Sequence, residues 1–423
     1  MAVINVDGDN PSVDPRVWET IQEGIDAAAS GDTIIVSPAT TVYAGGNNVP
    51  AGKRNLTIMG DPSGPRPIIG NWINTWAYFW GIQTSAPFTT YKHLQINSQQ
   101  GWCDGFDVYA ADCVIDDCVF LDTLGWGYGT YTALAHRLEI KNCNYTAGLV
   151  GVWFAGSSDM HIHHNIMKTA YAGGLVIFPY LTDSSGGVIE NNTFDTTALS
   201  GFNGAFRGII NLHSNVLIRG NKFKGRYINM GLGTGCGLDL AGAQDCILSE
   251  NDYREGIFEV SNVSLRAESA GGQFPADKSA DNNTFVGNEY NSLDLALSNG
   301  PDAGILVLDC STNTFSRENF NGYYPGKNDP RNIPCIRLNQ NSHENRIVVL
   351  RNGYTVPATA VCEQVYDYQW ETSDPPVSDN KAPPRRACTH MNAEIVSSYE
   401  LALAARVPAT ITLDQRHIDL LPE

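Results

Sequence analysis

Long apolar runs are missing from this sequence of 423 residues. No stretch approaches the roughly 18 consecutive apolar residues that a helix needs to cross a bilayer, so we expect no contact with a membrane. The start, Met1-Ala-Val-Ile, also lacks the basic residues and the apolar core of a signal peptide. A secreted protein with this sequence would have lost its signal or would use another export route.

Basic side chains are also scarce. Lys and Arg together number 27 against 45 for Asp and Glu, which gives a net charge of -18. Long-range repulsion at this charge opposes nonspecific binding to nucleic acid and to anionic membranes, and we expect neither partner. An anionic polysaccharide is not excluded, because a local group of arginines or a bound cation overrides the field of the whole molecule at short range.

One short pattern recurs along the sequence: an apolar residue, two spacers, a small or polar residue, one spacer, and an aromatic residue or methionine. Ile115-Asp-Asp-Cys118-Val-Phe120 and Ile218-Arg-Gly-Asn221-Lys-Phe223 are two copies. Self-similarity at a spacing of 22 to 37 residues predicts a solenoid. The fourth residues of the nine copies are Cys118, Cys143, Asn165, Asn192, Asn221, Asn251, Asn288, Glu318 and Asn352.

The fourth residue of each copy suits the inside of a coil. An Asn there donates its amide to one neighbouring coil and accepts from the other, so a buried polar group is satisfied by repetition. The apolar residue before it and the aromatic residue after it then both point inward. Runs such as Gly174-Leu-Val-Ile-Phe178 and Gly237-Leu-Asp-Leu240 precede the copies and show the period-two alternation of strands. A parallel β-helix of about 10–12 coils fits this order.

The cysteines give no sign of a zinc site, because none of the ten forms a Cys-x-x-Cys pair. Cys118 and Cys143 occupy equivalent positions in adjacent coils, where their Cα atoms would lie about 5 Å apart, within reach of a disulfide. Two stacked free thiols acting as small apolar groups explain the same pattern. Cys362 and Cys388, on either side of a proline-rich stretch, are the stronger disulfide candidates.

The N-terminal part of the sequence resembles a known family. Residues 14–30 carry Val17, Ile21 and Ile25 on one helical face, and the expected helix would cover the strand edges at this end of the solenoid. The runs Asp32-Thr-Ile-Ile-Val36 and Leu56-Thr-Ile-Met-Gly60 follow it. This order is similar to the start of right-handed parallel β-helix proteins of the pectate-lyase-like superfamily.

This resemblance implies an all-β fold, a single-stranded right-handed parallel β-helix with an N-terminal capping helix and a short C-terminal helical cap. We expect an N-terminal segment at 1–30, the β-helix at 31–369 and a C-terminal loop and capping tail at 370–423. Because most members act on glycans, the resemblance also implies a secreted or extracellular carbohydrate-active enzyme, either a glycoside hydrolase or a polysaccharide lyase. A noncatalytic glycan-binding protein, such as a phage tailspike or an adhesin, is the alternative.

The motifs of particular members are mostly missing. Polygalacturonases carry Asn-Thr-Asp, Asp-Asp and Gly-His-Gly motifs, of which we find only Asp116-Asp117, and the Arg-x-Pro-x-x-Arg stretch of the best-known pectate lyases is absent. The segments at 322–326, 336–339 and 344–347 are similar to a Tyr-Pro-Gly, Leu-Arg-Leu and Glu-Asn-Leu-Ile run of the inulin fructotransferases. That weaker resemblance implies intramolecular glycosyl transfer and a homotrimer as further alternatives.

A site on this fold must lie on an outer face, because side chains fill the interior. Alignment of the strands that precede the repeated pattern places several residues in one outward line, which we interpret as a candidate groove. These residues are Asp107, Trp153, Val176 or Phe178, Asn211, Asp239 and Arg337.

Asp239 is the leading catalytic candidate, because Leu238 and Leu240 on either side alternate as inward residues. Glu268 falls in the longest coil and would approach Asp239 from the next rung. Two carboxylates about 5 Å apart suit a retaining or intramolecular glycosyl transfer, whereas a wider gap admits an attacking water. A solvated surface carboxylate is the other interpretation of Asp239.

A lyase would need a different set of residues. Arg207 and His213 flank one strand and would serve as base and acid, unless they only cap turns. Asp104 and Asp107 would then hold Ca²⁺, which neutralises a uronate carboxylate, unless they are turn-forming residues. Outside a lyase we expect no cofactor. His161 and His163 alternate to one face and His164 to the other, so a three-histidine zinc site is not expected.

Aromatic residues support a glycan groove, because their faces stack on the apolar faces of sugar rings. We expect some of them to belong to the core or to the ends of the solenoid. The candidates for substrate binding are Trp126, Tyr128, Tyr131, Trp153 and Phe178, together with Asn211 and Arg266.

Overall fold

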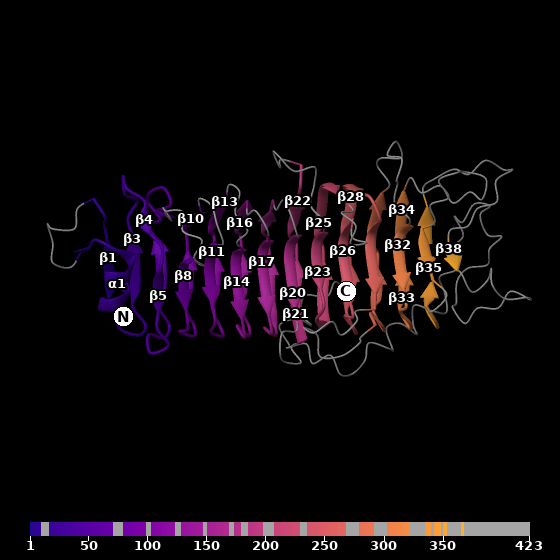
Figure 1. Cartoon of the computed structure of the whole chain (residues 1–423), viewed down its shortest axis with the longest axis horizontal. Coiled ribbons are helices and arrows are strands. Elements are labelled where there is room, and N and C mark those ends of the chain that lie inside the picture. Colours follow the sequence, from indigo (N-terminus) through magenta and orange to yellow (C-terminus); the bar gives the residue numbers. More distant parts are fainter. Residues whose placement is uncertain are drawn as a thin grey trace, which may run out of the picture.

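Parallel strands stacked coil upon coil make up this computed structural model. Figure 1 shows them side by side along the long axis, with the short helix α1 at the indigo end. The strands form three long sheets, here called A, B and C, and every pairing between them is parallel. The all-β parallel β-helix is therefore confirmed. The structure describes residues 1–9, 17–70, 79–98, 103–122, 128–146, 150–168, 173–178, 185–197, 207–228, 235–267, 279–291, 303–321, 335–339, 342–347, 350–352 and 365–367.

The three sheets share the strands in regular order. Sheet A consists of β1 (Val3–Val6), β2 (Val17–Trp18), β3 (Thr33–Val36), β6 (Thr57–Gly60), β9 (Thr90–Lys92), β12 (Val114–Asp116), β15 (Glu139–Lys141), β18 (Met160–His163), β21 (Ser185–Glu190), β24 (Ser214–Arg219), β27 (Ile247–Ser249), β30 (Thr284–Val286), β33 (Thr314–Ser316) and β36 (Arg346–Ile347). Sheet B consists of β4 (Tyr43–Ala44), β7 (Ile68–Gly70), β10 (Gln95–Ser98), β13 (Val119–Asp122), β16 (Asn144–Thr146), β19 (Ile166–Met167), β22 (Thr193–Asp195), β25 (Lys222–Tyr227), β28 (Asp252–Phe258), β31 (Glu289–Asn291), β34 (Glu318–Asn321) and β37 (Leu350–Asn352). Sheet C consists of β5 (Asn47–Val49), β8 (Phe79–Thr84), β11 (Cys103–Val108), β14 (Tyr128–Ala133), β17 (Val150–Ala155), β20 (Gly173–Phe178), β23 (Arg207–Asn211), β26 (Cys236–Ala241), β29 (Ser261–Arg266), β32 (Ala303–Leu308), β35 (Ile336–Leu338) and β38 (Val365–Asp367).

The repeated sequence pattern spans two strands and the turn between them. Its apolar residue lies in sheet A and its aromatic residue in sheet B, as Ile115 on β12 and Phe120 on β13 show. The residue between the strands has a left-handed backbone, and Asp117, Asn142 and Asn191 are examples with φ of 52°, 55° and 54°. Asn and Asp adopt this conformation at less cost than most side chains, which explains their frequency at this position.

A ladder of buried asparagine side chains joins successive coils at this turn. The Nδ2 atom of each Asn donates to the Oδ1 atom of its equivalent in the next coil, from Asn165 to Asn192 and Asn221 at 3.0 Å for each step. The same contact continues from Asn221 to Asn251 at 3.0 Å and to Asn288 at 2.9 Å. Each buried amide is thereby satisfied by its neighbours in the stack.

The interior of the solenoid is filled by columns of apolar and aromatic side chains. Phe223 and Tyr253 stack with their ring centroids 4.5 Å apart, and Tyr290 and Phe320 do so at 4.5 Å. Where the structure describes them, the apolar residues of the repeated pattern on sheet A, among them Ile115, are buried as predicted. Because similar side chains stack on one another in successive coils, they bury apolar surface and also hold neighbouring coils in register.

Cys118 and Cys143 continue the ladder column toward the N-terminus as free thiols. Both are buried, and the amide N–H of Cys118 donates to the Sγ atom of Cys143 at 3.5 Å. The interpretation as two stacked thiols is thus confirmed, and the disulfide between them is wrong. Cys362 and Cys388 lie outside the described residues, as does the predicted C-terminal helical cap.

The N-terminal cap differs from its predicted limits. The helix α1 covers only Ile21–Ala27, and the predicted start at residue 14 is wrong because Val17 and Trp18 form β2 in sheet A. Thr20 caps the helix, since its side chain accepts from the amide of Glu23 while the Glu23 side chain accepts from the amide of Thr20. Buried Ile21 and Ile25 join the main core, as an end cap requires.

Two details of the repeats differ from the sequence interpretation. Asn352 pairs with Phe320 in sheet B, so it lies two positions beyond the ladder and its assignment to the ladder is wrong. A second ladder, which the sequence pattern did not reveal, runs through the turn between sheets C and A, where the Nδ2 atom of Asn283 donates to Asn313 and that of Asn313 to Asn345, both at 3.1 Å. No helix among the described residues is long and apolar enough to span a bilayer.

Glu318 occupies the ladder where the other late coils have Asn, and this substitution has a consequence for stability. Burial raises the pKa of Glu318 to about 8, although hydrogen bonds from Tyr290 and Asn288 lower it. Between pH 4.5 and about 8 the folded chain therefore holds a proton that the unfolded chain has lost, so stability falls as pH rises through this window.

We expect Glu318→Gln to remove this pH dependence, because an amide has no proton to lose. The free energy of unfolding of the wild type should fall relative to the variant by up to about 1.4 kcal/mol for each pH unit in the window. Urea unfolding at pH 5, 6, 7 and 8 measures the difference. If the free energy of unfolding changed with pH in the same way for both proteins, the pKa of Glu318 would not differ between the folded and the unfolded chain.

Candidate functional site

The outer face of sheet C carries one line of side chains in register. Asp107 pairs with Tyr131, and Tyr131 with Trp153. The line continues through Val176, Ile210, Asp239, Ser264, Leu306 and Arg337. The predicted positions of Asp107, Trp153, Val176, Asp239 and Arg337 in one line are thus confirmed.

Asn211 does not belong to that line, and its predicted outward position is wrong. It pairs with Ile177 and Leu240, which are core residues, and it is fully buried. Ile210 takes the outward position instead. The interior accepts Asn211 because its Nδ2 atom donates to the backbone oxygen of His213 at 3.0 Å and its Oδ1 atom accepts from the amide of His213.

Two carboxyl groups meet near the N-terminal end of this line. Asp104 and Asp107 lie three residues apart on β11, a spacing that places side chains on opposite faces of a regular strand, yet their side chains share a hydrogen bond. Gly105 lies between them, where a Cβ atom would stand 2.4 Å from the carbonyl oxygen of Gly129. A Cβ there would also meet the core ring of Phe120 at 2.8 Å, so Gly105 and the core residue Phe106 both face inward. Strict alternation is broken at this point, which lets both aspartates reach one place.

The surroundings of this pair favour a shared proton. Burial, the nearby Asp104 charge and the hydrogen bond that protonated Asp107 donates to Asp104 raise the pKa of Asp107 to about 8, while Tyr109, whose hydroxyl donates to Asp107 Oδ2 at 3.4 Å, lowers it. Asp104 accepts from the amide of Tyr128 at 2.9 Å. Burial and the charge of Asp104 also raise the pKa of Tyr128, to about 12. Burial and the neighbouring carboxyl group therefore favour the protonated form of Asp107.

Aromatic rings surround the carboxyl pair. The ring centroids of Tyr128 lie 5.0 Å from Trp153 and 5.8 Å from Tyr131, and those of Tyr131 and Tyr109 are 6.1 Å apart. Three of these residues were predicted to bind substrate, and the structure brings them together. The sequence analysis did not include Tyr109, although it lies two residues after Asp107, a spacing that period-two alternation would have placed on the same face.

Asp239 lies further along the line, between two arginines. The Arg207 Nε atom is 2.8 Å from Asp239 Oδ2, and the Arg266 Nε atom is 3.0 Å from Oδ1 and 3.2 Å from Oδ2. Only 1% of the Asp239 side chain is exposed, against 13% for Arg207 and 29% for Arg266. The structure therefore joins three predicted site residues in a buried ion group, which we call the Asp239 group. A carboxylate engaged in this way fixes the arginines more readily than it attacks a sugar.

We expect Asp239→Asn to destabilise the fold, because it leaves two largely buried guanidinium groups without their carboxylate. The loss should be about 3 kcal/mol in the free energy of unfolding. Asp112→Asn is the matched control, since Asp112 binds Arg137 at 2.7 Å but that guanidinium is 57% exposed, and its loss should cost under about 1 kcal/mol. Urea unfolding of both variants measures these losses. Equal losses for Asp239→Asn and Asp112→Asn would contradict the conclusion that burial makes the Asp239 group more costly to break.

The predicted pairing of Arg207 with His213 is not formed. Arg207 begins β23, whereas His213 follows its end and is buried beside Asn211 and Cys246, so the two do not face one sugar as a lyase would require. The predicted acid–base pair of Arg207 and His213 is therefore wrong. Glu268 and Trp126 lie outside the described residues, as does the side chain of Phe178.

The carboxyl pair offers little for calcium. Ca²⁺ binds six to eight oxygen atoms, and Asp104 and Asp107 supply two carboxyl groups, of which that of Asp107 favours its protonated form. Asp107 Oδ1 is buried without a hydrogen-bond partner. These residues alone do not form a calcium cage.

The sequence of residues 104–352 matches the protein family described as right handed beta helix region. The chain belongs to that family. Its coil is therefore right-handed, as predicted. No curated protein matches the sequence.

Solved structures of the same fold have varied activities. The Dettilon tailspike protein is 12% identical, with a TM-score of 0.61 over 89% of this chain and 70% of its own. The Streptococcus pneumoniae surface adhesin PfbA is 14% identical, with a TM-score of 0.55 over 86% and 94%. The lacto-N-biosidase from Eubacterium ramulus is 11% identical, with a TM-score of 0.55 over 83% and 67%. At this identity the similarity shows the fold alone.

Proposed function

We propose that this chain is a secreted or extracellular glycoside hydrolase that cleaves a polysaccharide lying along the outer face of sheet C. The observation that carries the proposal is the hydrogen-bonded pair of Asp104 and Asp107, with its raised pKa, beside Tyr109, Tyr128 and Trp153. Acid–base cleavage of a glycosidic bond needs two carboxyl groups in opposite protonation states. The pair meets that need near neutral pH.

The aromatic residues extend the pair into a binding surface. Tyr131 and Trp153 occupy the two strands that follow Asp107, and successive strands are about 4.8 Å apart. Their rings would stack on the apolar faces of successive sugar rings, which holds a chain along the solenoid axis. That direction is also the direction in which a polysaccharide repeats.

The chemistry follows from the protonation of the pair. Asp107, as the neutral acid, would donate its proton to the glycosidic oxygen while the bond from that oxygen to the anomeric carbon breaks. The water that attacks the anomeric carbon would then return a proton to the hydrogen-bonded pair, since Asp104 and Asp107 stand too close together for one to act from each side of the bond. The products are two alcohols, one of them a new reducing end, and the pair returns to one proton in all.

We expect Asp107→Asn to abolish the release of reducing ends from the substrate, with a fall in kcat of roughly 100-fold or more, because an amide cannot donate the proton. The assay uses a panel of neutral and uronate polysaccharides and follows reducing ends and absorbance near 235 nm together. Asp112→Asn, a surface carboxylate in the same coil, should retain full activity. Cleavage by Asp107→Asn at the wild-type rate would exclude this residue as the acid.

The activity should also depend on pH in one direction. Asp107 must be protonated to act, and its pKa is raised to about 8, so kcat should be retained up to about pH 8 and fall above it. A profile of kcat from pH 5 to 10 on the cleaved polysaccharide tests this. A fall already complete at pH 6 would contradict the assignment.

A glycan-binding protein without activity is the second candidate, and one observation favours it. Asp104 and Asp107 are 1% and 0% exposed, whereas Tyr109 is 36% exposed, so the aromatic surface is more accessible than the carboxyl pair. This candidate predicts that the wild type binds a polysaccharide without releasing reducing ends or raising the absorbance, and that Tyr131→Ala or Trp153→Ala weakens the binding. That result would overturn the hydrolase.

A further inference from the structure

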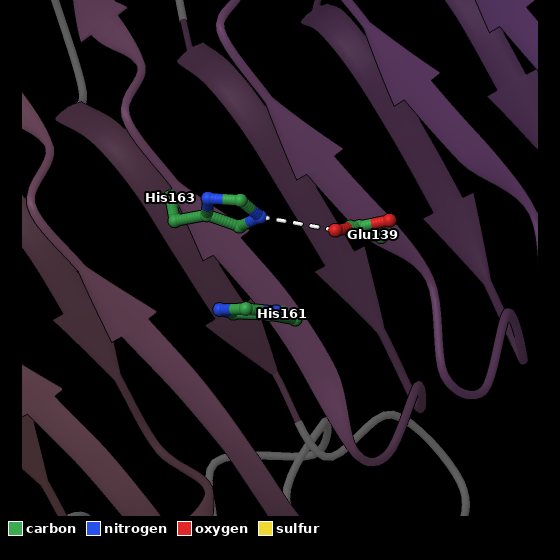
Figure 2. A group of neighbouring side chains, drawn as sticks. All are labelled: Glu139, His161 and His163. Atoms are coloured by element: carbon green, nitrogen blue, oxygen red, sulfur yellow. Dashed lines mark hydrogen bonds and ion pairs between the residues drawn. The ribbon is translucent and has the colours of Figure 1, made fainter. Parts of the chain in front are cut away.

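A second group of titratable side chains lies on sheet A, away from the carboxyl pair on sheet C. Glu139 comes from β15, and His161 and His163 come from the next strand of the sheet, β18 (Figure 2). His161 and His163 share one face, as their alternation predicted, and their rings stack with centroids 4.1 Å apart. We call these three residues the Glu139 cluster.

The Glu139 cluster has the dimensions of a metal site. One potential ligand atom from each residue lies within 4.8 Å of the others, and His163 Nε2 already stands 3.1 Å from Glu139 Oε1. Ligand atoms about 2.0–2.2 Å from a tetrahedral zinc ion are separated by roughly 3.4 Å. Side-chain rotations that move the ligand atoms by about 1 Å would therefore bring them to these separations around an ion, with the backbone unchanged. Among the described residues, no other group of three potential ligands of this kind occurs.

The donor atoms of the cluster suit a transition metal ion. Two imidazole nitrogens and one carboxylate oxygen are the kind of donor set that zinc binds in proteins.

Neighbouring residues orient the two imidazoles. Glu190 on β21 lies 2.8 Å from His161 Nε2 and is itself held by Arg219 at 2.7 Å. A carboxylate in that position accepts a hydrogen bond from the Nε2–H group of His161. The Nδ1 atom of His161 is then left for an ion, as in carboxylate–histidine–zinc triads. Lys141 Nζ stands 3.0 Å from Glu139 Oε1 and would move aside when an ion binds.

We propose that Glu139, His161 and His163 form a binding site for a divalent transition metal ion of the zinc class. The ligands come from two adjacent coils, and Glu190 supports them from a third, so a bound ion would join three rungs of the solenoid on its outer surface. The site is partly exposed, since 35% of the His161 side chain and 29% of the Glu139 side chain are accessible. An ion can therefore enter directly from solvent.

Metal binding is tested on the full chain after dialysis against EDTA, with Zn²⁺ as the titrant in isothermal calorimetry. We expect Glu139→Gln and His163→Gln each to weaken binding by roughly tenfold or more, and the wild-type Tm to rise with added Zn²⁺ more than the Tm of either variant. The control is His93→Gln, because His93 also contacts a carboxylate, Asp117 at 2.7 Å, but has no second imidazole beside it. It should bind Zn²⁺ as the wild type does.

Cobalt supplies a second readout that does not depend on affinity alone. Co²⁺ in the same site should give visible d–d absorption in the wild type, and this absorption should disappear in the double variant His161→Asn with His163→Gln. Circular dichroism without metal checks that each variant is folded. Zn²⁺ affinity and Co²⁺ absorption that are unchanged in folded variants would overturn the site, as would failure of the wild type to bind either ion.

Discussion

The in-register stacking of one coil on the next is the constraint on which the rest of this structure depends. Each strand of sheets A, B and C pairs in parallel with its equivalent in the next coil, so a residue's contacts are set by the same position one coil away. The ladder of Asn165, Asn192, Asn221, Asn251 and Asn288 fixes that register from the inside, because a shift would leave buried amides unsatisfied.

The same stacking determines what the surface can do. Outward side chains form columns along the axis, and two of these columns bring titratable side chains together. On sheet C, Asp107, Tyr131 and Trp153 place a carboxyl group in line with aromatic rings. On sheet A, Glu139 and His161 meet across neighbouring strands. Neither arrangement is local in sequence, and both exist only because the coils are aligned.

The repeated pattern was enough to predict the solenoid, the inward Ile115 and Phe120, and the outward Asp239. It could not reveal the Asp239 group, because two of its contacts come from other coils and depend on side-chain reach. Alternation alone also placed Asn211 outside, since it does not show which of two neighbouring residues, Ile210 or Asn211, faces the core. The hydrogen bond between Asp104 and Asp107 depends on the irregular backbone at Gly105, which a strict period of two excludes.

The ladder also has a direction. The Nδ2 atom of each Asn donates toward the C-terminal neighbour, as in the contact from Asn221 to Asn251. Its other N–H donates to a carbonyl of the preceding coil, as from Asn221 to Ile189 at 2.9 Å, so only one of the two needs the following coil. A ribosome makes the chain in the same direction, N-terminal coils first. In each newly made coil, one N–H group of the ladder Asn therefore finds its protein acceptor only when the next coil folds onto it.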